Sequence, residues 1–356
     1  MKKILFLSPV PLDNEPSGIS IRINELKSRF EDIGVRDKIA DRYNGEAADY
    51  LYLMVSTKED SVAFEVASRG GKIPLIVDLY TPVFLEKDLS FNIFSPYDWL
   101  VRFQKKQVVK KIIQRGDHFF VANRRQKDYW LKTTRELKIK IKRNDISVIP
   151  TGAPKFNVRK LPFPQRHVIL WFGGMYPWMN PSLLIEAFSK IAYKYPTWEL
   201  RILGGFHPKT GYQLLYQKII EEAQKTLSKN SLEIVPWQES EKLPDFLKDV
   251  AFAVHLPKNT REDYYSHRVR LLTLLNSKIP VITSGRDTIS DLIVKYQGGT
   301  RVVANPQDLG KKMEKLINTP GLLLSWMENT TKIQDAYLNS ESEIKTFSKI
   351  IGLNDK

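Results

Sequence analysis

Residues 168–181 read Val-Ile-Leu-Trp-Phe-Gly-Gly-Met-Tyr-Pro-Trp-Met-Asn-Pro, and this stretch indicates how the chain folds. Its first five residues predict a buried β-strand, and the glycine pair predicts a tight turn. Asn180 is a good helix N-cap, and Pro181 suits the first helical position. Apolar residues then recur at helical spacing, at Leu183, Leu184, Ala187, Phe188 and Ile191. A strand, a loop and a helix in this order are typical of a parallel sheet covered by helices.

The same pattern recurs on both sides of this stretch. The first unit pairs a strand at Ile4–Leu7 with a helix that carries Ile23, Leu26 and Phe30 and ends at Gly34. Further strands are predicted at residues 51–55, 74–78, 118–123, 146–150, 200–203, 232–235, 252–256, 280–283 and 300–303.

The order of these units predicts two domains. Residues 153–165 contain three prolines without any apolar period, which is typical of a linker. We therefore expect one Rossmann-like domain at residues 1–155, a second at 156–335, and a helical segment at 336–356 that packs back on the first domain. Ligands of such sheets bind where the strands end, so a central cleft between the domains is the expected site.

Composition excludes several classes of protein. The 356 residues are 42% apolar and contain no cysteine, which rules out disulfides, thiolate metal sites and a thiol nucleophile. The first apolar run is too short for a signal peptide, and no stretch approaches the roughly 20 apolar residues of a membrane-spanning helix. A cytoplasmic location is expected.

Familiar cofactor and metal motifs are missing from the sequence. It holds no Gly-x-Gly-x-x-Gly, no Gly-Lys-Ser/Thr, no His-Glu-x-x-His and no Asp-x-Asp, and its five histidines lack metal-ligand spacing. Dinucleotide dehydrogenases and P-loop enzymes are therefore disfavoured. We expect neither a metal ion nor a cofactor.

Several segments resemble, in the right order and over nearly the whole chain, blocks of the bacterial family 4 (group 1) glycosyltransferases. These are residues 16–22 (PSGISIR), 77–82 (VDLYTP), 122–130 (ANRRQKDYW), 148–152 (VIPTG), 171–181 (WFGGMYPWMNP) and 266–272 (SHRVRLL). The resemblance implies a GT-B fold, in which two Rossmann-like domains with parallel sheets face a central cleft. It also implies metal-independent transfer with retention of configuration, from a nucleotide-sugar substrate in the C-terminal domain to an acceptor in the N-terminal one. The similar subgroup acts in cell-surface polysaccharide synthesis.

The sequence departs from the family pattern at four polar positions. An arginine and a lysine that hold donor phosphates fall on Gly174 and Met179, and two glutamates fall on Tyr265 and Thr273. Because an arginine fork suits a diphosphate, we transfer the phosphate role to Arg268 and Arg270, helped by backbone N–H groups of the glycine pair.

The candidate site residues divide between the two domains. The donor set is Gly173, Gly174, Trp178, Trp237, Arg268, Arg270 and Thr273; the acceptor set is Gly18, Arg22 and Tyr80; and Asp78 is the candidate catalytic residue. Each has a structural alternative. The glycines suit a tight turn, the tryptophans a core, the arginines a solvated helix face, and Asp78 a cap.

The formal net charge of +15 favours an anionic partner. Residues 98–115 predict a basic amphipathic helix, and residues 132–143 add further cations. A lipid-linked or glycan acceptor at the inner, anionic face of a membrane would explain this charge. Alternatively, the apolar stripe of the helix packs on the sheet. No nucleic-acid-binding module is recognised. The remaining alternatives for function are a catalytically degenerate nucleotide- or sugar-binding protein, a nucleotide-sugar epimerase, a hydrolase and, on charge alone, a nucleic-acid binder.

Overall fold

The computed structural model describes most of the chain. The described residues are 2–7, 18–32, 36–40, 45, 47–55, 65, 69, 71–88, 92–152, 158–162, 165–205, 212–337 and 341–352. The loop expected at residues 8–17, the helix cap at Gly34 and most of the linker expected at residues 153–165 lie outside them.

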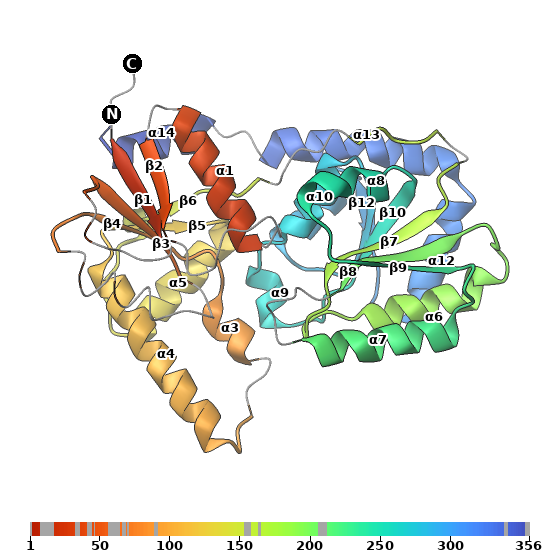
Figure 1. The fold of residues 1–356 in the computed structure, drawn as a ribbon, viewed down its shortest axis with the longest axis horizontal. Helices are drawn as coiled ribbons and strands as arrows, with labels where there is room; N and C mark the ends of the chain where they lie inside the picture. The colour runs from red at the N-terminus through yellow and green to blue at the C-terminus, as the bar shows by residue number, and fades with distance from the viewer. Residues whose placement is uncertain are drawn as a thin grey trace.

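The first domain is a six-stranded sheet, entirely parallel, in the order β2-β1-β3-β4-β5-β6 (Figure 1). Its strands are β1 (Lys3–Leu7), β2 (Arg36–Ala40), β3 (Tyr50–Met54), β4 (Leu75–Asp78), β5 (His118–Val121) and β6 (Ile146–Val148). Its helices are α1 (Gly18–Asp32), α3 (Val83–Asp88), α4 (Pro96–Arg115) and α5 (Arg124–Glu136), with a 3-10 turn, η1, at Arg143–Asp145.

The second domain is another six-stranded parallel sheet, in the order β12-β11-β10-β7-β8-β9. Its strands are β7 (Val168–Gly174), β8 (Glu199–Gly205), β9 (Leu232–Pro236), β10 (Val250–His255), β11 (Val281–Thr283) and β12 (Gly299–Arg301). Its helices are α6 (Pro181–Ala192), α7 (Gln213–Thr226), α8 (Leu243–Leu247), α9 (Arg261–Tyr265), α10 (Val269–Asn276), α11 (Thr288–Lys295), α12 (Pro306–Ile317) and α13 (Pro320–Tyr337), with the turn η2 at Ser240–Lys242. The strand order reverses between β7 and β10, the position at which such sheets bind ligands.

Several helices begin at a short polar residue whose side chain can accept a hydrogen bond from the first turn. Ser95, Asn123 and Asp287 each accept hydrogen bonds from backbone N–H groups in the first turn of α4, α5 and α11, respectively. Asn180 occupies the N-cap of α6, but its side chain makes no capping bond. Its backbone N–H instead donates to the carbonyl of Leu256, which ties the loop after β7 to the end of β10.

Two elements differ from the sequence prediction. Strand β2 is not predicted from the sequence, because Arg-Asp-Lys-Ile-Ala contains no apolar run. It lies at the edge of the sheet, where charged side chains are common. The helical segment expected at residues 336–356 is described as the end of α13 and as α14 (Glu341–Ile350).

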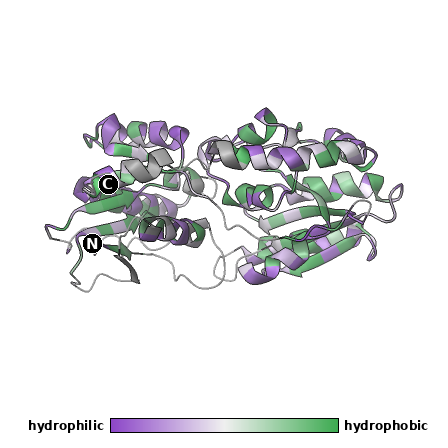
Figure 2. Cartoon of the chain, turned by 90° about the horizontal axis from the view of Figure 1, so that it is seen from above, coloured by the Kyte–Doolittle hydropathy of each residue, from purple (hydrophilic) through white to green (hydrophobic). Residues whose placement is uncertain are grey.

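Both sheets are buried on their two faces. In β1, Ile4 and Phe6 face one apolar cluster while Leu5 and Leu7 face another, which is the period of two that a strand imposes. Figure 2 shows the result from above, with mostly hydrophobic strands inside the two lobes. Among the described helices, none combines the length and the apolar character that crossing a membrane requires.

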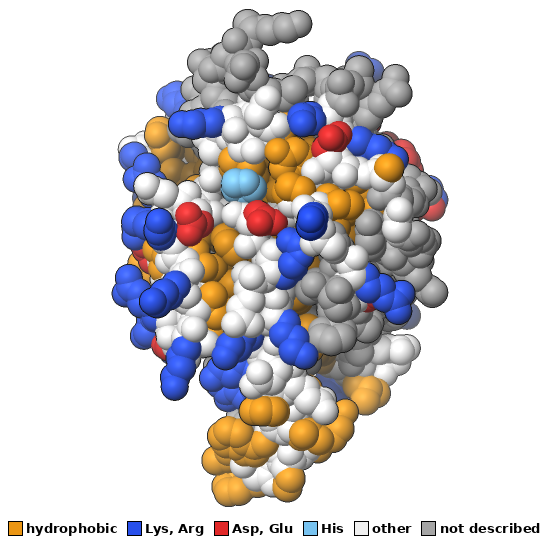
Figure 3. All heavy atoms as spheres, turned by 90° about the vertical axis from the view of Figure 1, so that its left-hand side faces the viewer, with side chains coloured by type: hydrophobic (Ala, Val, Ile, Leu, Met, Phe, Trp, Pro, Cys, Tyr) orange, Lys and Arg blue, Asp and Glu red, His pale blue; other side chains and the backbone are white. Residues whose placement is uncertain are grey.

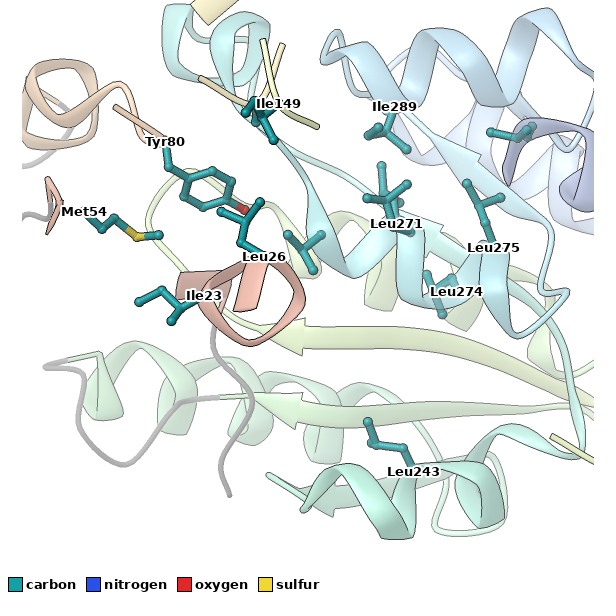
Figure 4. Close-up of a cluster of buried hydrophobic side chains, with 14 of the residues drawn as sticks. Ile23, Leu26, Met54, Tyr80, Ile149, Leu243, Leu271, Leu274, Leu275 and Ile289 are labelled. Atoms are coloured by element: carbon teal, nitrogen blue, oxygen red, sulfur yellow. The ribbon is translucent and has the colours of Figure 1, made fainter. Parts of the chain in front are cut away.

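The two domains share an apolar cluster. Ile23 and Leu26 of α1, together with Ile149 after β6, belong to the same buried cluster as Leu271 and Leu274 of α10 (Figure 4). Helix α14 lies against the first domain, where the ring of Phe347 stacks on that of Phe30 with centroids 3.6 Å apart. Since each buried side chain of this kind contributes roughly 1.5–3 kcal/mol, the shared cluster holds the two halves together.

Candidate functional site

Two glycine pairs end the adjacent strands β7 and β8. Gly173 pairs with Gly204 and Gly174 with Gly205 in the parallel register. Three of the four have a positive φ, at 87° for Gly173, 114° for Gly204 and 88° for Gly205, which side chains other than glycine rarely adopt. A Cβ at Gly204 would lie 3.1 Å from the backbone of Gly173. Cβ atoms at Gly174 and Gly205 would clash with the rings of Tyr176 and Tyr216, so close packing at this edge of the sheet requires glycine.

Arg270 lies against the end of β7. It lies in the first turn of α10, and its Nη1 donates to the carbonyls of Phe172 (3.3 Å) and Gly174 (3.0 Å). Its guanidinium lies 5.6 Å from the centre of the Tyr176 ring, and no carboxylate of the described residues pairs with it. Burial lowers the pKa of Arg270 to about 10. Arg270 is thus a half-buried cation at the switch point of the sheet, and no carboxylate among the described residues pairs with it.

Arg268, two residues earlier, has a different environment. Its Nη2 donates to the carboxylates of Glu262 at 2.8 Å and Asp263 at 3.4 Å, and all three side chains are buried. Burial acts to lower the pKa of Arg268, but these carboxylates outweigh it and raise that pKa above its usual value. Asp263 also accepts from the backbone N–H of Arg286. The guanidinium of Arg268 is thus already paired with two carboxylates of the protein. Arg270 is therefore the better candidate for binding a donor phosphate.

Burial shifts the pKa values of one acidic and one basic neighbour, Asp287 and His255, so that their neutral forms are favoured. The pKa of Asp287 rises to about 6, because burial and the nearby Asp263 carboxylate both disfavour its ionised form. The pKa of His255, at the end of β10, falls well below its usual value because of burial and the cations Arg270 and Arg268. A neutral His255 leaves Arg270 as the dominant cation next to the glycine pairs.

The other donor candidates have different surroundings. Trp178 stacks on Tyr176, with ring centroids 4.8 Å apart, and Tyr212 meets both rings edge-on. Trp237 is half-buried just after β9. Thr273 differs from the expectation: it is buried within α10, where its hydroxyl donates to the carbonyl of Val269. Thr273 lies in the second turn of α10, where its hydroxyl bonds to the backbone of its own helix.

The carboxyl edge of the first sheet holds a buried ion pair. Arg22 of α1 donates through Nε and Nη2 to the two carboxylate oxygens of Asp78, and both side chains are fully buried. Tyr52 of β3 donates its hydroxyl to Asp78, and Arg22 also donates to the carbonyl of Ile149. Burial acts to lower the pKa of Arg22, but Asp78 outweighs it and raises that pKa. Burial raises the pKa of Tyr52, which keeps its phenol neutral.

This pair changes the interpretation of Asp78. We expected the end of β4 to present a carboxylate to the cleft, whereas the structure surrounds that carboxylate with Arg22 and Tyr52. Asp78 can therefore act on a ligand only through its neighbours. Of the acceptor candidates, Tyr80 packs its ring 4.9 Å from the Arg22 guanidinium, and Gly18 is exposed beside the Tyr80 hydroxyl. The structure thus brings the four candidates of the first domain together.

His267 joins the two domains. Its Nε2 lies 3.4 Å from the carbonyl of Thr151, after β6, and its Nδ1 lies 3.0 Å from the hydroxyl of Tyr337 on α13. The ring of Tyr80 meets the imidazole edge-on at 5.8 Å. Burial, with the Arg22 cation nearby, lowers the pKa of His267 to about 3, so the imidazole is neutral. Nearby, the amide of Asn123 donates to the carbonyl of Ser266 at 3.5 Å. Loops after first-domain strands therefore contact the segment that carries Arg268 and Arg270.

Three parts of this site are not predicted from the sequence. Gly204 and Gly205 carry a visible signal, since Leu-Gly-Gly after β8 repeats the Phe-Gly-Gly that ends β7. Tyr52 gives no signal, because an aromatic residue in a strand is common. His267 lay within a recognised block, but its partners are 116 and 70 residues away in sequence.

Comparison with known proteins identifies the fold. None of the curated proteins matches the chain. Among solved structures, it is similar to sucrose-phosphate synthase from Thermosynechococcus elongatus (TM-score 0.71, 12% identity, 98% of each chain covered). It is also similar to HepE from Anabaena in complex with UDP and glucose (TM-score 0.70, 13% identity, 99% of this chain and 100% of that chain). A third is an alpha-glucosyltransferase in complex with UDP and DNA (TM-score 0.69, 11% identity, 98% and 99%).

A family model decides the classification. The model "Glycosyl transferases group 1" matches residues 155–333, about half of the chain, which covers the second sheet, the glycine pairs and both arginines. The expected GT-B architecture of two parallel-sheet α/β domains is confirmed by the structures above. The chain belongs to the group 1 glycosyltransferases.

Proposed function

We propose that this enzyme transfers a sugar from a nucleotide-sugar donor, bound at the carboxyl edge of the second sheet, to an acceptor bound by the first domain. Arg270 carries the proposal. It is a half-buried guanidinium without a carboxylate partner among the described residues, and it lies against Gly173 and Gly174. A diphosphate would supply an anionic partner, because the guanidinium fork can donate two hydrogen bonds to it. Structures of similar fold that hold UDP or UDP-glucose support this choice of ligand.

We propose that the transfer needs no divalent ion. As the bond between sugar and diphosphate breaks, negative charge develops on the leaving phosphate, and a fixed guanidinium stabilises it without reorganisation. Arg270 begins the first turn of α10, where the positive end of the helix dipole adds to its charge. No cofactor takes part.

The finer assignments rest on the resemblance of the sequence blocks. We propose membership of family 4, retention of anomeric configuration, and a glycan or lipid-linked acceptor used in cell-surface polysaccharide synthesis, in the cytoplasm at the inner face of the membrane. The acceptor would bind near Gly18 and Tyr80, which lie next to the buried pair of Arg22 and Asp78.

A second candidate function is nucleotide-sugar binding without transfer. Its support lies in two positions where the family pattern has glutamates. Tyr265 packs its ring against Tyr129 of the first domain at 5.2 Å, and the Thr273 hydroxyl is bonded within its own helix. Neither position offers a charged group to a donor. A binding protein of this kind would retain the diphosphate site and lack turnover.

A turnover assay separates the two candidates. The protein is incubated with a panel of nucleotide sugars and membrane or glycan extracts in the presence of a chelator, and the products are identified by mass spectrometry. A transferase releases nucleoside diphosphate only when an acceptor is present and adds one sugar mass to it; proton NMR of that product then reports retention. Binding of a nucleotide sugar without any release supports the second candidate. Release without an acceptor would indicate a hydrolase.

A further inference from the structure

Helix α4 has two dissimilar halves. It contains 20 residues and is therefore roughly 30 Å long. Val109, Ile112 and Ile113 in its second half are buried in the core of the first domain. Its first half extends away from both sheets and ends in a free tip (Figure 1). The core thus fixes the direction in which the tip points.

The tip carries an unusual concentration of exposed apolar side chains. Large apolar residues with at least a third of their surface exposed number twelve in the described chain, and six lie within residues 93–103. These six are Ile93, Phe94, Tyr97, Trp99, Leu100 and Phe103, with exposed fractions from 53% to 87%. Scattered exposed apolar residues are ordinary, whereas a contiguous group indicates a binding surface. We call residues 92–103 the apolar tip.

Hydrogen bonds within the apolar tip keep it in shape. The indole N–H of Trp99 donates to the carbonyl of Ile93 at 3.0 Å, and the backbone N–H of Asn92 donates to Asp98 at 2.9 Å. Ser95 caps the helix by accepting from the N–H of Asp98 at 3.2 Å. These bonds satisfy polar groups that would be costly to place in an apolar medium. Asp98, the one acid of the tip, lies at the positive end of the helix.

Cations follow the apolar tip along the helix. Arg102 lies at the end of the tip, and Lys106, Lys110 and Lys111 occupy the next two turns; of these four, Lys106 and Lys111 are exposed. Figure 3 shows an apolar end of the molecule with Lys and Arg side chains gathered behind it. An apolar end followed by positive charge matches the two layers of a bilayer surface, with acyl chains inside and anionic headgroups outside.

We propose that the apolar tip inserts into the interfacial layer of a bilayer that contains anionic lipids, while the cations of α4 contact the headgroups. A projecting tip fits a lipid surface that closes around it. The inference does not depend on the proposed transfer reaction, because it concerns a surface of α4 and no part of the donor site. It corrects the sequence alternative in which the whole apolar stripe of this helix packs on the sheet: only its second half does so.

Vesicle binding tests the proposal with a matched control. The tip variant is Trp99→Gln/Leu100→Gln/Phe103→Gln, in which glutamine preserves helix propensity. The control variant is Tyr193→Gln/Leu214→Gln/Val303→Gln, whose three apolar side chains are 67–76% exposed in the second domain. We expect the wild type and the control to sediment with vesicles of phosphatidylcholine and phosphatidylglycerol, and the tip variant to bind about a hundredfold more weakly. Binding should weaken on vesicles of phosphatidylcholine alone, and in high salt.

Depth-dependent quenching then tests insertion directly. Phospholipids brominated on the acyl chains should quench the wild type, and most of that quenching should disappear in Trp99→Phe, which keeps an apolar ring and should still sediment. The proposal is overturned if the tip and control variants bind vesicles equally, or if Trp99→Phe is quenched as strongly as the wild type. It is also overturned if light scattering shows that the tip variant only converts a dimer into a monomer, since the occupant would then be a second copy.

Discussion

The carboxyl edges of the two sheets hold an arginine in opposite ways. In the first domain, Arg22 is fully buried and both oxygens of Asp78 accept from it. In the second domain, Arg270 is half-buried, and its neighbours are carbonyls and an aromatic ring. A paired charge stabilises the fold that contains it, whereas an unpaired one is a cost that a ligand can relieve. The difference indicates that the first edge is internal structure and the second is a binding site.

The largest expected effect concerns the paired arginine. Arg22→Met leaves the Asp78 carboxylate buried without its partner, so we expect a loss of about 3–5 kcal/mol in the free energy of unfolding. Urea denaturation measures it. The double variant Arg22→Met/Asp78→Asn should cost less than the two single variants added together, because it removes both charges. A single variant that unfolds like the wild type would contradict the structural role of this pair.

The opposite behaviour is expected of Arg270. Arg270→Met removes a half-buried charge that forms no ion pair with the described carboxylates, so the melting temperature without ligand should stay the same or rise. Turnover should fall by roughly two orders of magnitude, since a charged hydrogen bond to the leaving phosphate contributes about 2–3 kcal/mol. Arg268→Met is the matched control. It should lower the melting temperature, because it leaves the buried acids Glu262 and Asp263 without their cation.

Protonation of His267 tests the contact between the two edges. Its pKa is about 3 in the folded chain, against about 6.5 when unfolded, so between these values the unfolded chain binds more protons. Stability contributed by this group is therefore present above pH 6.5 and is lost as the pH falls. Between pH 7.5 and 5, the wild type should lose about 1–2 kcal/mol more than His267→Gln does, as measured by denaturation. Equal losses would show that His267 does not titrate in this way.

The smallest effect is expected at the exposed rim between the domains. Arg125 of α5 donates to Asp291 of α11, and its guanidinium also lies over the ring of Tyr264 at 4.3 Å. Because this pair is partly exposed and Asp291 keeps Arg301 as a partner, Arg125→Ala should cost less than about 1 kcal/mol, and this loss should shrink in high salt. A loss of several kcal/mol, found by denaturation at both salt concentrations, would move the main domain contact from the shared apolar cluster to this rim.

Sequence reasoning was most successful where a signal is local. Apolar runs such as Val168–Phe172 gave eleven of the twelve strands, and they failed at β2, whose five residues include three charged ones. The proximity of Arg270 to Gly173 followed from the order of family blocks, whereas the ion pair between Arg22 and Asp78 joins residues 56 apart. No local sequence pattern predicts an ion-pair partner that lies so far away along the chain. For that reason a strand-end carboxylate was interpreted as catalytic when the fold uses it internally.

The assignment of the diphosphate to Arg270 is tested most directly by isothermal titration calorimetry. A panel of nucleoside diphosphates is titrated into the wild type and into Arg270→Met, with a chelator present throughout. We predict that at least one diphosphate binds the wild type without any divalent ion, and that Arg270→Met binds it roughly thirtyfold or more weakly. Binding that requires a divalent ion, or that is unchanged in the variant, would contradict the account.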